Sequence, residues 1–468
     1  MLEGLEISEV SNLALERTVR LDSEFYKKEN LITLDLLKRH EILNLTEITK
    51  VSDGNHNAIS EKFQDTGIPY YRGQDVSSFF VENAEPMCID KDTFHLPVMK
   101  RSHLKKGDVL LSIVGTIGKL SLVYSDKQAT CSCKLAILRP FGVSAEFLAI
   151  FLESKYGQNQ IKKFTRGAVQ MGLILEDANQ IFIPQLSKPF QQQIEDLVKS
   201  AHSTQETSKN LYQEAENLLL SELGIDENVF KVSKNEVVTN VKSFADFESS
   251  WRLDAEYYQP KYEILEGVIE KYGFVQLRNI IEKVTTGFTY ESSNFCEKGI
   301  PLIRISNISK TGLNISNAAQ ITIEDAALSP KDKAEKGEVL ISMSGSIGLS
   351  CVIREEIQAF VNQRIMKFKP VGFDADVLSL LINSEIVRKQ LERVGTGGVQ
   401  TNLSNTDILE IKIPNLNSEF QMDISNKIQE SFRLKTKSEQ LLSLAKRAVE
   451  LAIEEGEDVA MAWITERK

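Results

Sequence analysis

The chain has 468 residues, 42% of them hydrophobic and 26% charged, which is an ordinary balance for a globular protein of roughly two to four domains. No run approaches the ~18 apolar residues that cross a bilayer, and the acidic N-terminal segment lacks a signal pattern. Five scattered cysteines exclude a disulfide framework, and the pair Cys131 and Cys133 is typical of apolar strand residues rather than of a metal site. We therefore expect a cytoplasmic protein without membrane contacts.

The net charge of −11 is unevenly distributed. Residues 41–188 carry 17 basic against 16 acidic side chains, and residues 275–416 carry 16 against 16, so the excess acid lies in the segments around them. Non-specific phosphate binding scales with the number of phosphates that Lys and Arg neutralise. Two nearly neutral segments therefore predict weak non-specific binding to phosphates, although each can still carry a basic face. If this chain binds DNA, a partner must contribute.

The sequence repeats itself at an offset of 230 to 232 residues. Six blocks recur in the same order, 20–26 with 252–258, 67–72 with 299–304, 106–118 with 336–348, 167–170 with 397–400, 183–184 with 413–414, and 190–191 with 420–421. This period exceeds the 20 to 50 residues of solenoid repeats, so each copy is a domain-sized unit. We predict two domains related by a pseudo-two-fold axis, an arrangement that suits a bipartite target.

Each copy begins with a short helical lead. The first lead is assigned to residues 1–40, and the second, with an acidic connector before it, to residues 226–274. In the second lead Tyr262, Leu265 and Ile269 follow a helical spacing.

The lead is followed by a mixed core, at residues 41–188 in the first copy and 275–416 in the second. Short apolar runs alternate with Gly, Asn, Asp and Pro, which predicts strands and turns. The predicted buried strands are 109–114 and 339–344, and the predicted helical runs are 146–164 and 376–394. Each core is therefore expected to combine a twisted sheet with helices packed on it.

Each copy ends in a long helix, at residues 189–225 and 417–468, the latter including a C-terminal tail. Seam residues recur alternately three and four apart, which is a heptad pattern. They are Leu197, Ala201, Thr204, Ser208, Leu211, Ala215 and Leu218 in the first helix, and Ile424, Lys427, Ser431, Leu434, Ser438, Leu441, Ala445 and Ala448 in the second. Both seams turn polar near the middle, and polar seam residues fix register. We expect the two helices to pack on each other rather than each on its own domain.

No catalytic set is visible in the sequence. The segment 115–119 (GTIGK) lacks the first glycine and the final Ser or Thr of a phosphate loop, and Leu349 replaces Lys119 in the second copy. All five histidines lie in the first half, so no triad or zinc site is duplicated. The carboxylates are interpreted as surface solvation rather than as general acids and bases.

Hydrogen-bonding side chains on loops do recur. Arg72 and Gln74 follow the Gly-Ile-Pro segment, and the second copy has Arg304 and Asn307 there. Arg suits guanine, and Asn or Gln suits adenine, in the major groove, while further Lys and Arg suit phosphates. The candidate DNA contacts are Arg72, Gln74, Lys119, Lys134, Arg166, Gln170, Arg304, Asn307, Ser344, Gln363, Arg364, Thr396, Gln400 and Asn402. The alternative is that these are ordinary polar loops.

These features together resemble the specificity (S) subunit of type I restriction–modification systems. The resemblance covers nearly the whole chain. It is carried by RLDAEYYQP (252–260), Gly-Ile-Pro, KGDVLLS with KGEVLIS, GTIG with GSIG, G-x-V-Q, and Ile-Pro followed by Phe-Gln at the helix start. Each motif is short, but their order, duplication and position before a heptad helix are specific.

The resemblance implies an α+β fold, with two tandem mixed α/β target-recognition domains in pseudo-two-fold arrangement, separated by two long antiparallel coiled-coil helices. It implies a non-catalytic scaffold that reads a bipartite double-stranded DNA target. Two methyltransferase subunits would bind S-adenosylmethionine and dock on it, nuclease-translocase subunits would join for cleavage, and the chain itself would hold no cofactor. Ser132-Cys133 in place of Asn362-Gln363 suggests half-sites of different sequence. Two alternatives stay open, a self-contained DNA-modifying enzyme and a protein scaffold that does not bind DNA.

Overall fold

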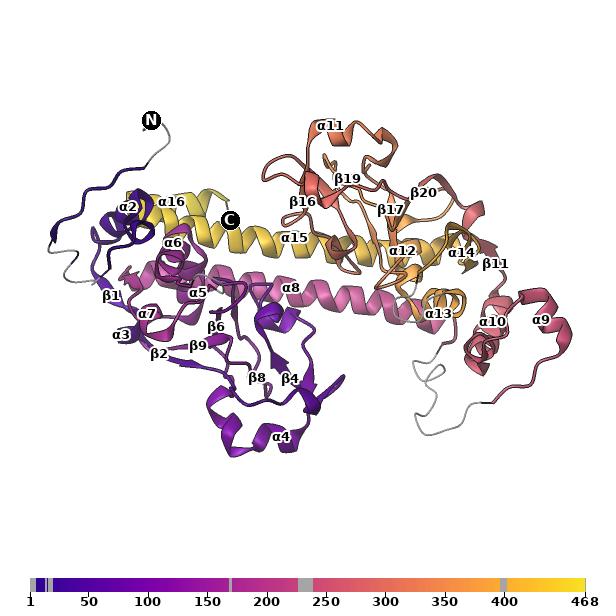
Figure 1. The fold of residues 1–468 in the computed structure, drawn as a ribbon, viewed down its shortest axis with the longest axis horizontal. Coiled ribbons are helices and arrows are strands. Elements are labelled where there is room, and N and C mark those ends of the chain that lie inside the picture. The colour runs from indigo at the N-terminus through magenta and orange to yellow at the C-terminus, as the bar shows by residue number, and fades with distance from the viewer. Residues whose placement is uncertain are drawn as a thin grey trace. The chain divides into compact units, whose positions relative to one another are not determined.

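The computed structural model describes residues 6–12, 15, 20–167, 171–225, 239–395 and 402–467. The chain forms two compact units. Unit 1 contains Met1–Glu206 and Leu434–Lys468, and unit 2 contains Thr207–Arg433. Unit 1 is therefore built from the two ends of the chain, and unit 2 from its middle (Figure 1).

Unit 1 contains two four-stranded sheets and a small two-stranded one. The strands are β1 (Ile42–Asn44), β2 (Thr49–Asp53), β3 (Phe63–Gln64), β4 (Ile68–Tyr71), β5 (Cys88–Ile89), β6 (Val109–Ser112), β7 (Leu120–Leu122), β8 (Thr130–Cys131), β9 (Leu135–Pro140) and β10 (Phe182–Pro184). One sheet has the order β2-β9-β6-β7 and the other β3-β5-β4-β8, and β1 pairs with β10. All pairs are antiparallel except β4 with β8. Strand β6 is buried at every residue, which its continuous apolar run predicts.

Unit 2 repeats this topology. Its strands are β11 (Phe274–Gln276), β12 (Ile281–Thr285), β13 (Ile300–Ile303), β14 (Ile308–Ser309), β15 (Gly312–Leu313), β16 (Ala319–Ile321), β17 (Val339–Ser342), β18 (Ser350–Val352), β19 (Phe360–Val361), β20 (Ile365–Pro370) and β21 (Lys412–Pro414). The order β12-β20-β17-β18 matches the first sheet of unit 1, and β16-β13-β19 includes the parallel pair β13 and β19. Strand β11 pairs with β21, as β1 does with β10. The predicted duplication of a mixed α/β fold is confirmed by this shared strand order.

Helices flank the sheets in both units. Unit 1 contains α2 (Lys28–Leu37), α3 (Leu45–Ile48), α4 (Lys91–His95), α5 (Ala145–Glu153), α6 (Lys155–Phe164), α7 (Leu175–Ala178) and α16 (Glu457–Arg467). Unit 2 contains α9 (Phe244–Ser250), α10 (Pro260–Tyr272), α11 (Ile323–Ala326), α12 (Ala375–Asn383), α13 (Glu385–Val394) and α14 (Asn405–Leu409). In the part of the chain that the structure covers, no helix is long and apolar enough to span a bilayer.

The helical run predicted at 146–164 is divided into α5 and α6 at Ser154. The Ser154 side chain accepts a hydrogen bond from the Gly157 backbone N–H at 3.4 Å, so it caps the second helix. Gly157 has no room for a side chain, because a Cβ there would lie 2.4 Å from the Phe151 carbonyl oxygen. The run at 376–394 divides in the same way, into α12 and α13 at Ser384. The apolar periodicity continues across each break, so the sequence pattern does not predict that one helix ends there and another begins.

The two long helices, α8 (Lys188–Glu222) and α15 (Ser418–Glu455), each contribute one part to each unit. In unit 2 the hydroxyls of Ser208 and Ser431 each donate to the other residue's carbonyl oxygen at 2.7 Å. In unit 1 the Ser438 hydroxyl donates to the Ala201 carbonyl at 2.7 Å. Moving back seven residues along α8 thus moves forward seven along α15, so the pairing is antiparallel (Figure 1). The predicted antiparallel pair with a polar middle is confirmed.

The seam differs from the predicted one at two positions. Leu218 is only half-buried, and Leu219 packs in the core instead. Lys427 is half-buried and forms an ion pair with Glu214 at 3.3 Å, while Ile428 takes the core position. A helix that packs on a domain as well as on a second helix buries a stripe wider than a strict heptad seam.

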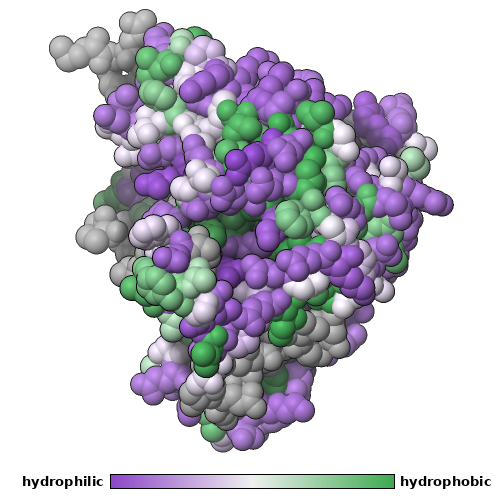
Figure 2. Space-filling view, turned by 90° about the vertical axis from the view of Figure 1, so that its right-hand side faces the viewer, coloured by the Kyte–Doolittle hydropathy of each residue, from purple (hydrophilic) through white to green (hydrophobic). Residues whose placement is uncertain are grey.

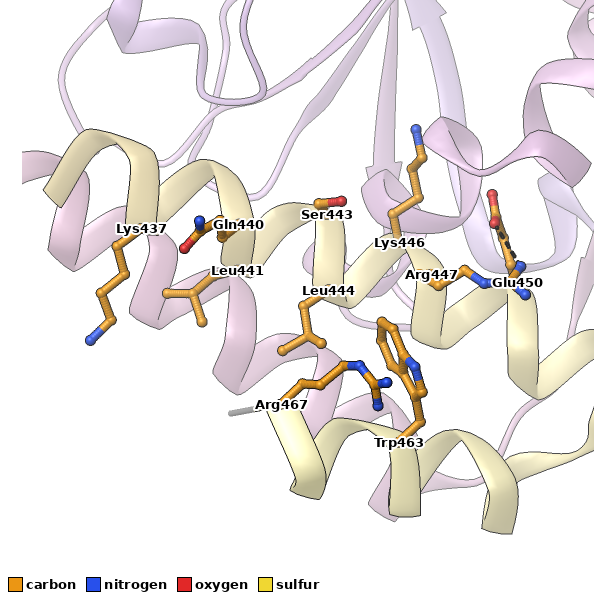
Figure 3. Close-up of a pocket in the computed structure, with 10 residues that line it drawn as sticks. All are labelled: Lys437, Gln440, Leu441, Ser443, Leu444, Lys446, Arg447, Glu450, Trp463 and Arg467. Atoms are coloured by element: carbon orange, nitrogen blue, oxygen red, sulfur yellow. Dashed lines mark hydrogen bonds and ion pairs between the residues drawn. The ribbon is translucent and has the colours of Figure 1, made fainter. Parts of the chain in front are cut away.

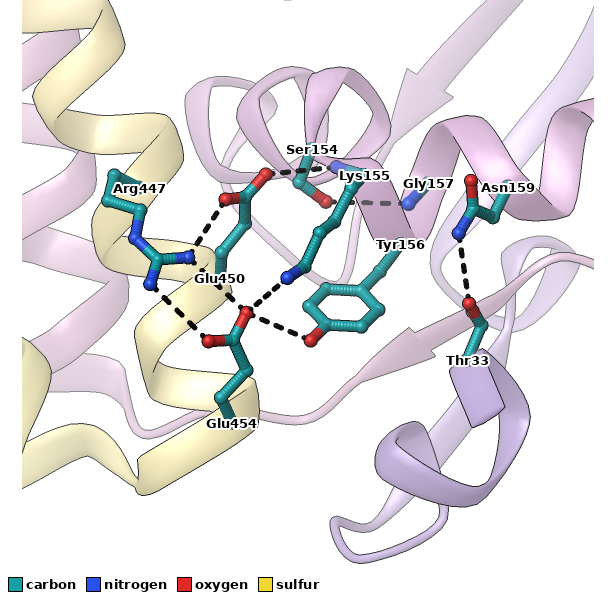
Figure 4. A network of polar contacts seen from close by, with 9 residues as sticks. All are labelled: Thr33, Ser154, Lys155, Tyr156, Gly157, Asn159, Arg447, Glu450 and Glu454. Atoms are coloured by element: carbon teal, nitrogen blue, oxygen red, sulfur yellow. Dashed lines mark hydrogen bonds and ion pairs between the residues drawn. The ribbon is translucent and has the colours of Figure 1, made fainter. Parts of the chain in front are cut away.

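A polar network attaches α6 to α15 within unit 1 (Figure 4). The Glu450 carboxylate accepts a hydrogen bond from the Lys155 backbone N–H at 3.0 Å, at the N-terminus of α6. Glu454 accepts from Tyr156 Oη at 3.0 Å and pairs with Lys155 Nζ at 2.6 Å, and Arg447 reaches both carboxylates. Burial alone would raise the pKa of Glu454, but the bonds from Lys155 and Tyr156 lower it below its ordinary value. The network holds α6 of unit 1 on the long helix α15.

Candidate nucleic-acid interface

The ends of β4, β6 and β8 meet in unit 1, and two of the predicted residues follow them. Arg72 follows β4 directly, and Lys134 lies between β8 and β9. The backbone N–H of Ser132 donates to the Tyr71 carbonyl at 2.9 Å, and that of Ile113 donates to the Lys134 carbonyl at 3.0 Å. These bonds hold the loops after β4, β6 and β8 together.

These loops line a cavity of about 680 Å³. Its wall contains Arg72, Gln74 and Lys134, together with Asn57, Ala58, Ile59, Ser60, Phe63, Tyr70, Gly73, Val114, Gly115, Thr116 and Ser132. Two cations and several amide or hydroxyl groups thus share a wall with apolar side chains. Such a surface offers hydrogen bonds to base edges and charge to phosphates.

Unit 2 brings the equivalent strand ends together. The backbone N–H of Asn362 donates to the Ile303 carbonyl at 2.9 Å, and that of Met343 donates to the Arg364 carbonyl at 2.8 Å. Arg364 is exposed and has a left-handed backbone with φ 70°. Ser344 and Asn402 form a β-bridge, as Val114 and Gly172 do in unit 1.

The arginine after the Gly-Ile-Pro strand is fixed in the same way in both units. The Arg72 backbone N–H donates to Asp75 Oδ2 at 2.8 Å, and its Nε lies 3.2 Å from the same oxygen. The Arg304 backbone N–H donates to Asn307 Oδ1 at 2.9 Å, and its guanidinium lies 5.8 Å from the centre of the Phe295 ring. Both arginines remain partly exposed. Their guanidinium groups therefore project from a fixed backbone.

Asn307, a predicted DNA contact, is buried in unit 2, and its contact with DNA stays a prediction. Asn307 is 7% exposed, and its amide donates to the Asn314 carbonyl at 2.9 Å while its oxygen accepts from Arg304. It is equivalent to Asp75, the residue that fixes Arg72. The exposed counterpart of Gln74 is Ser306. Ser344 is also buried, at 6% exposed, and its contact with DNA likewise stays a prediction.

The remaining predicted residues are more scattered. Lys119 is exposed but does not line the cavity. Arg166 forms an ion pair at 2.6 Å with buried Asp177, which commits part of its guanidinium to the domain. Exposed Gln363 accepts a hydrogen bond from Thr289 at 2.8 Å. Gln170, Thr396 and Gln400 lie outside the described residues.

Sequence reasoning missed the segment 57–60, which forms a wall of the cavity in unit 1. It is not one of the repeated blocks, since Asn57 is replaced by Thr289 in the second copy. A local signal in the sequence is the Asn-x-Asn pattern of Asn55 and Asn57, which is typical of a side-chain-stabilised turn.

A second cavity of unit 1, of about 590 Å³, lies between α15 and α16 (Figure 3). Its wall contains Lys437, Lys446, Arg447 and Arg467 against a single acid, Glu450. The Arg467 guanidinium lies 5.0 Å from the centre of the Trp463 ring. This basic surface belongs to the long-helix region and not to the strand ends that carry the predicted readers.

Unit 2 exposes apolar side chains around α9. Phe244 is 71% exposed, Trp251 80% and Leu253 82%. Figure 2, which views the side on which α9 and α10 lie in Figure 1, shows hydrophobic side chains in patches among hydrophilic ones. Exposed apolar patches often mark protein interaction sites.

Several histidines and a cysteine of the described residues have structural surroundings. Across the described ranges, no three His, Cys, Asp or Glu side chains are placed to hold a metal ion. His40 and His103 bond to backbone carbonyls, and His56 lies 2.6 Å from Asp53 Oδ2. Burial raises the pKa of the Cys131 thiol, which disfavours the nucleophilic thiolate.

Comparison with known proteins identifies the class of domain. Residues 269–443 match the type I restriction modification DNA specificity domain. This segment covers most of the sheets and helices of unit 2 and continues along α15 as far as residue 443. The predicted resemblance to type I specificity subunits is therefore confirmed.

Individual proteins are also similar to this chain. The chain is 26% identical over 207 residues to the type I restriction enzyme MjaVIII specificity subunit of Methanocaldococcus jannaschii, an alignment that covers 40% of this chain and 46% of the relative. Among solved structures, the type I S subunit of M. genitalium aligns at 15% identity over 91% of this chain and 95% of its own, with a TM-score of 0.37. The HsdS subunit of Thermoanaerobacter tengcongensis aligns at 15% identity over 89% and 97%, with a TM-score of 0.29.

Proposed function

We propose that this chain is the non-catalytic DNA-specificity subunit of a type I restriction–modification complex. Its two recognition domains, 41–188 and 275–416, each read one half of a bipartite double-stranded DNA target. One observation carries the proposal: Arg72 and Arg304 occupy the same position after a parallel strand pair, with the same backbone cap, in both units. Duplicated readers suit two half-sites.

The long helices 189–225 and 417–468 serve as a spacer between the two readers, and 1–40 and 226–274 are the leads of the two repeats. The reciprocal serine pair supports this role, because buried polar seam residues favour one register over its alternatives. A single register gives a single spacing between half-sites.

The chemistry resides in partner subunits. Two methyltransferase subunits bind S-adenosylmethionine and modify the DNA, and nuclease-translocase subunits join them for cleavage, all in the cytoplasm. The chain itself is not an enzyme and holds no cofactor. The nearly neutral charge of the two recognition domains supports a role for partner subunits, because partners then supply much of the phosphate contact. The exposed apolar side chains around α9 support docking of a partner protein.

The test is to mix the full chain with its methyltransferase partner and with DNA that carries two randomised half-sites. We expect a gel shift that selects a split sequence with a fixed spacer, and adenine methylation at that sequence only when both proteins are present. Methyl transfer by the chain alone would instead establish a self-contained enzyme. Equal binding to all sequences would support a scaffold that does not read DNA.

A further inference from the structure

The loop after β2 lies directly against the end of β8 in unit 1. The backbone N–H of Asn55 donates to the Cys131 carbonyl at 2.8 Å, and that of Cys133 donates to the Asn55 carbonyl at 2.9 Å. A Cβ on Gly54 would lie 2.4 Å from the carbonyl oxygens of Cys131 and Ser132, so only glycine fits. The position of this loop is thus set by the strand that ends at the cavity.

Asn55 fixes the orientation of its neighbour Asn57. Asn55 is 2% exposed, and its amide donates to the Asn57 carbonyl at 2.9 Å. Its side-chain oxygen accepts both the backbone N–H and the side-chain amide of Asn57, each at 3.0 Å. A buried side chain therefore holds an exposed one in place on the cavity wall.

The side-chain amide of Asn57 keeps free hydrogen-bonding groups, and these indicate what it can bind. A carboxamide has two N–H donors and one oxygen acceptor. One donor is used by Asn55, and the oxygen has no partner among the described residues. One donor and one acceptor, side by side, match the N7 acceptor and N6 donor that adenine presents in the major groove.

We propose that Asn57 reads an adenine in the half-site bound by unit 1, and that Asn55 is its positioning residue. This inference rests on the proposed function. Gln74, on the same cavity, has the same hydrogen-bonding groups, but it is exposed, and no side chain among the described residues orients it. A reader that is already ordered loses less side-chain entropy on binding, which favours Asn57.

The second repeat supports a role in specificity. Thr289 occupies the position of Asn57 and donates to Gln363 Oε1 at 2.8 Å, and Cys133 occupies the position of Gln363 in unit 1. Each repeat therefore presents one oriented carboxamide from this region, on different loops. Two half-sites of different sequence require such a difference.

The proposal is tested in cells that lack other adenine methyltransferases. The wild-type chain and Asn57→Ala are each expressed with the methyltransferase partner, and methylated sites are mapped genome-wide. We expect the wild type to require an adenine at one position of one half-site and the variant to accept other bases there, with the second half-site and the spacer unchanged. Gln128→Ala, an exposed change at the other end of β8, is the matched control and should leave the target intact.

Binding to modified DNA tests the contact itself. Each adenine of that half-site is replaced in turn by 7-deazaadenine, which lacks the N7 acceptor. At one position we expect a loss in affinity of roughly 5-fold or more, because N7 accepts one of the two hydrogen bonds of a bidentate contact, whose whole discrimination is about 5- to 150-fold. Asn57→Ala and Asn55→Ala should show no further loss at that position. If the wild-type chain binds equally well after every replacement, the proposal is overturned, even if the variants fold poorly. If the wild-type chain selects no bipartite target at all, the proposed function fails instead.

Discussion

Lengthening the antiparallel helix pair by one heptad should lengthen the spacer in the DNA target. The register that pairs Ser208 with Ser431 and Ala201 with Ser438 places Gln205 opposite Leu434. Duplicating residues 199–205 and 434–440 therefore inserts seven residues at facing positions, close to where the two units divide. Seven residues add about 10 Å of helix, near three base pairs of DNA rise.

The assay is the genome-wide methylation map of cells that carry the lengthened chain. We expect both half-site sequences to be unchanged and the unread spacer to be about three base pairs longer. Three base pairs also rotate one half-site by roughly 100° around the duplex, so methylation should be less efficient than with the natural chain. Three inserted heptads add about 31 Å, near nine base pairs and almost a full turn, and should restore efficiency.

A single insertion in α8 alone is the control. It displaces Ser208 from Ser431 by about 10 Å. We therefore expect both a loss of stability and a loss of methylation at sites with a fixed spacer. If the doubly inserted chain methylates only the natural spacing, the helices do not set the distance between half-sites and the spacer role is refuted.

Three further outcomes are expected. Arg72→Ala should cost about 1–3 kcal/mol of discrimination in one half-site only, and Arg304→Ala in the other, as methylation maps of both variants would show; altered reading of both half-sites by either variant would contradict modular readout. Burial lowers the pKa of Lys163 to about 8. The unfolded chain therefore binds that proton more tightly, so stability should rise between about pH 8 and 10.5, and melting curves of Lys163→Met should lack this rise. Lys367 pairs with buried Glu338 at 2.6 Å, and Lys367→Met should destabilise unit 2 by about 3–5 kcal/mol in urea unfolding, which Glu338→Gln should largely recover.

The sequence predicted those features that local patterns encode. Apolar runs such as 109–112 became buried strands, and the matched serines predicted a polar contact in the middle of the helix pair. Repetition extended these predictions to the second unit without further information. The break at Ser154 was missed because apolar spacing continues through it.

The candidate site was predicted less completely, because its geometry depends on long-range contacts. Asn307 looked like a reader from its residue type, but its place as the cap of Arg304 is evident only from the fold. Asn57 carried no repeat signal, and its relation to Tyr70 and Lys134 depends on strands far apart in sequence. A sequence repeat gives no guidance about residues that differ between the two copies.

The discontinuity of unit 1 has a consequence for synthesis. Its core includes Ala445, Ala448 and Val449 of α15, which leave the ribosome after the whole of unit 2 has been made. Domains generally fold in the order in which they are translated, but here unit 1 is completed last. A chain that stops after residue 433 would carry a finished unit 2 and an unfinished unit 1. Under the proposed function, such a fragment would lack one of its two specificities, so the fold would link bipartite reading to completed translation.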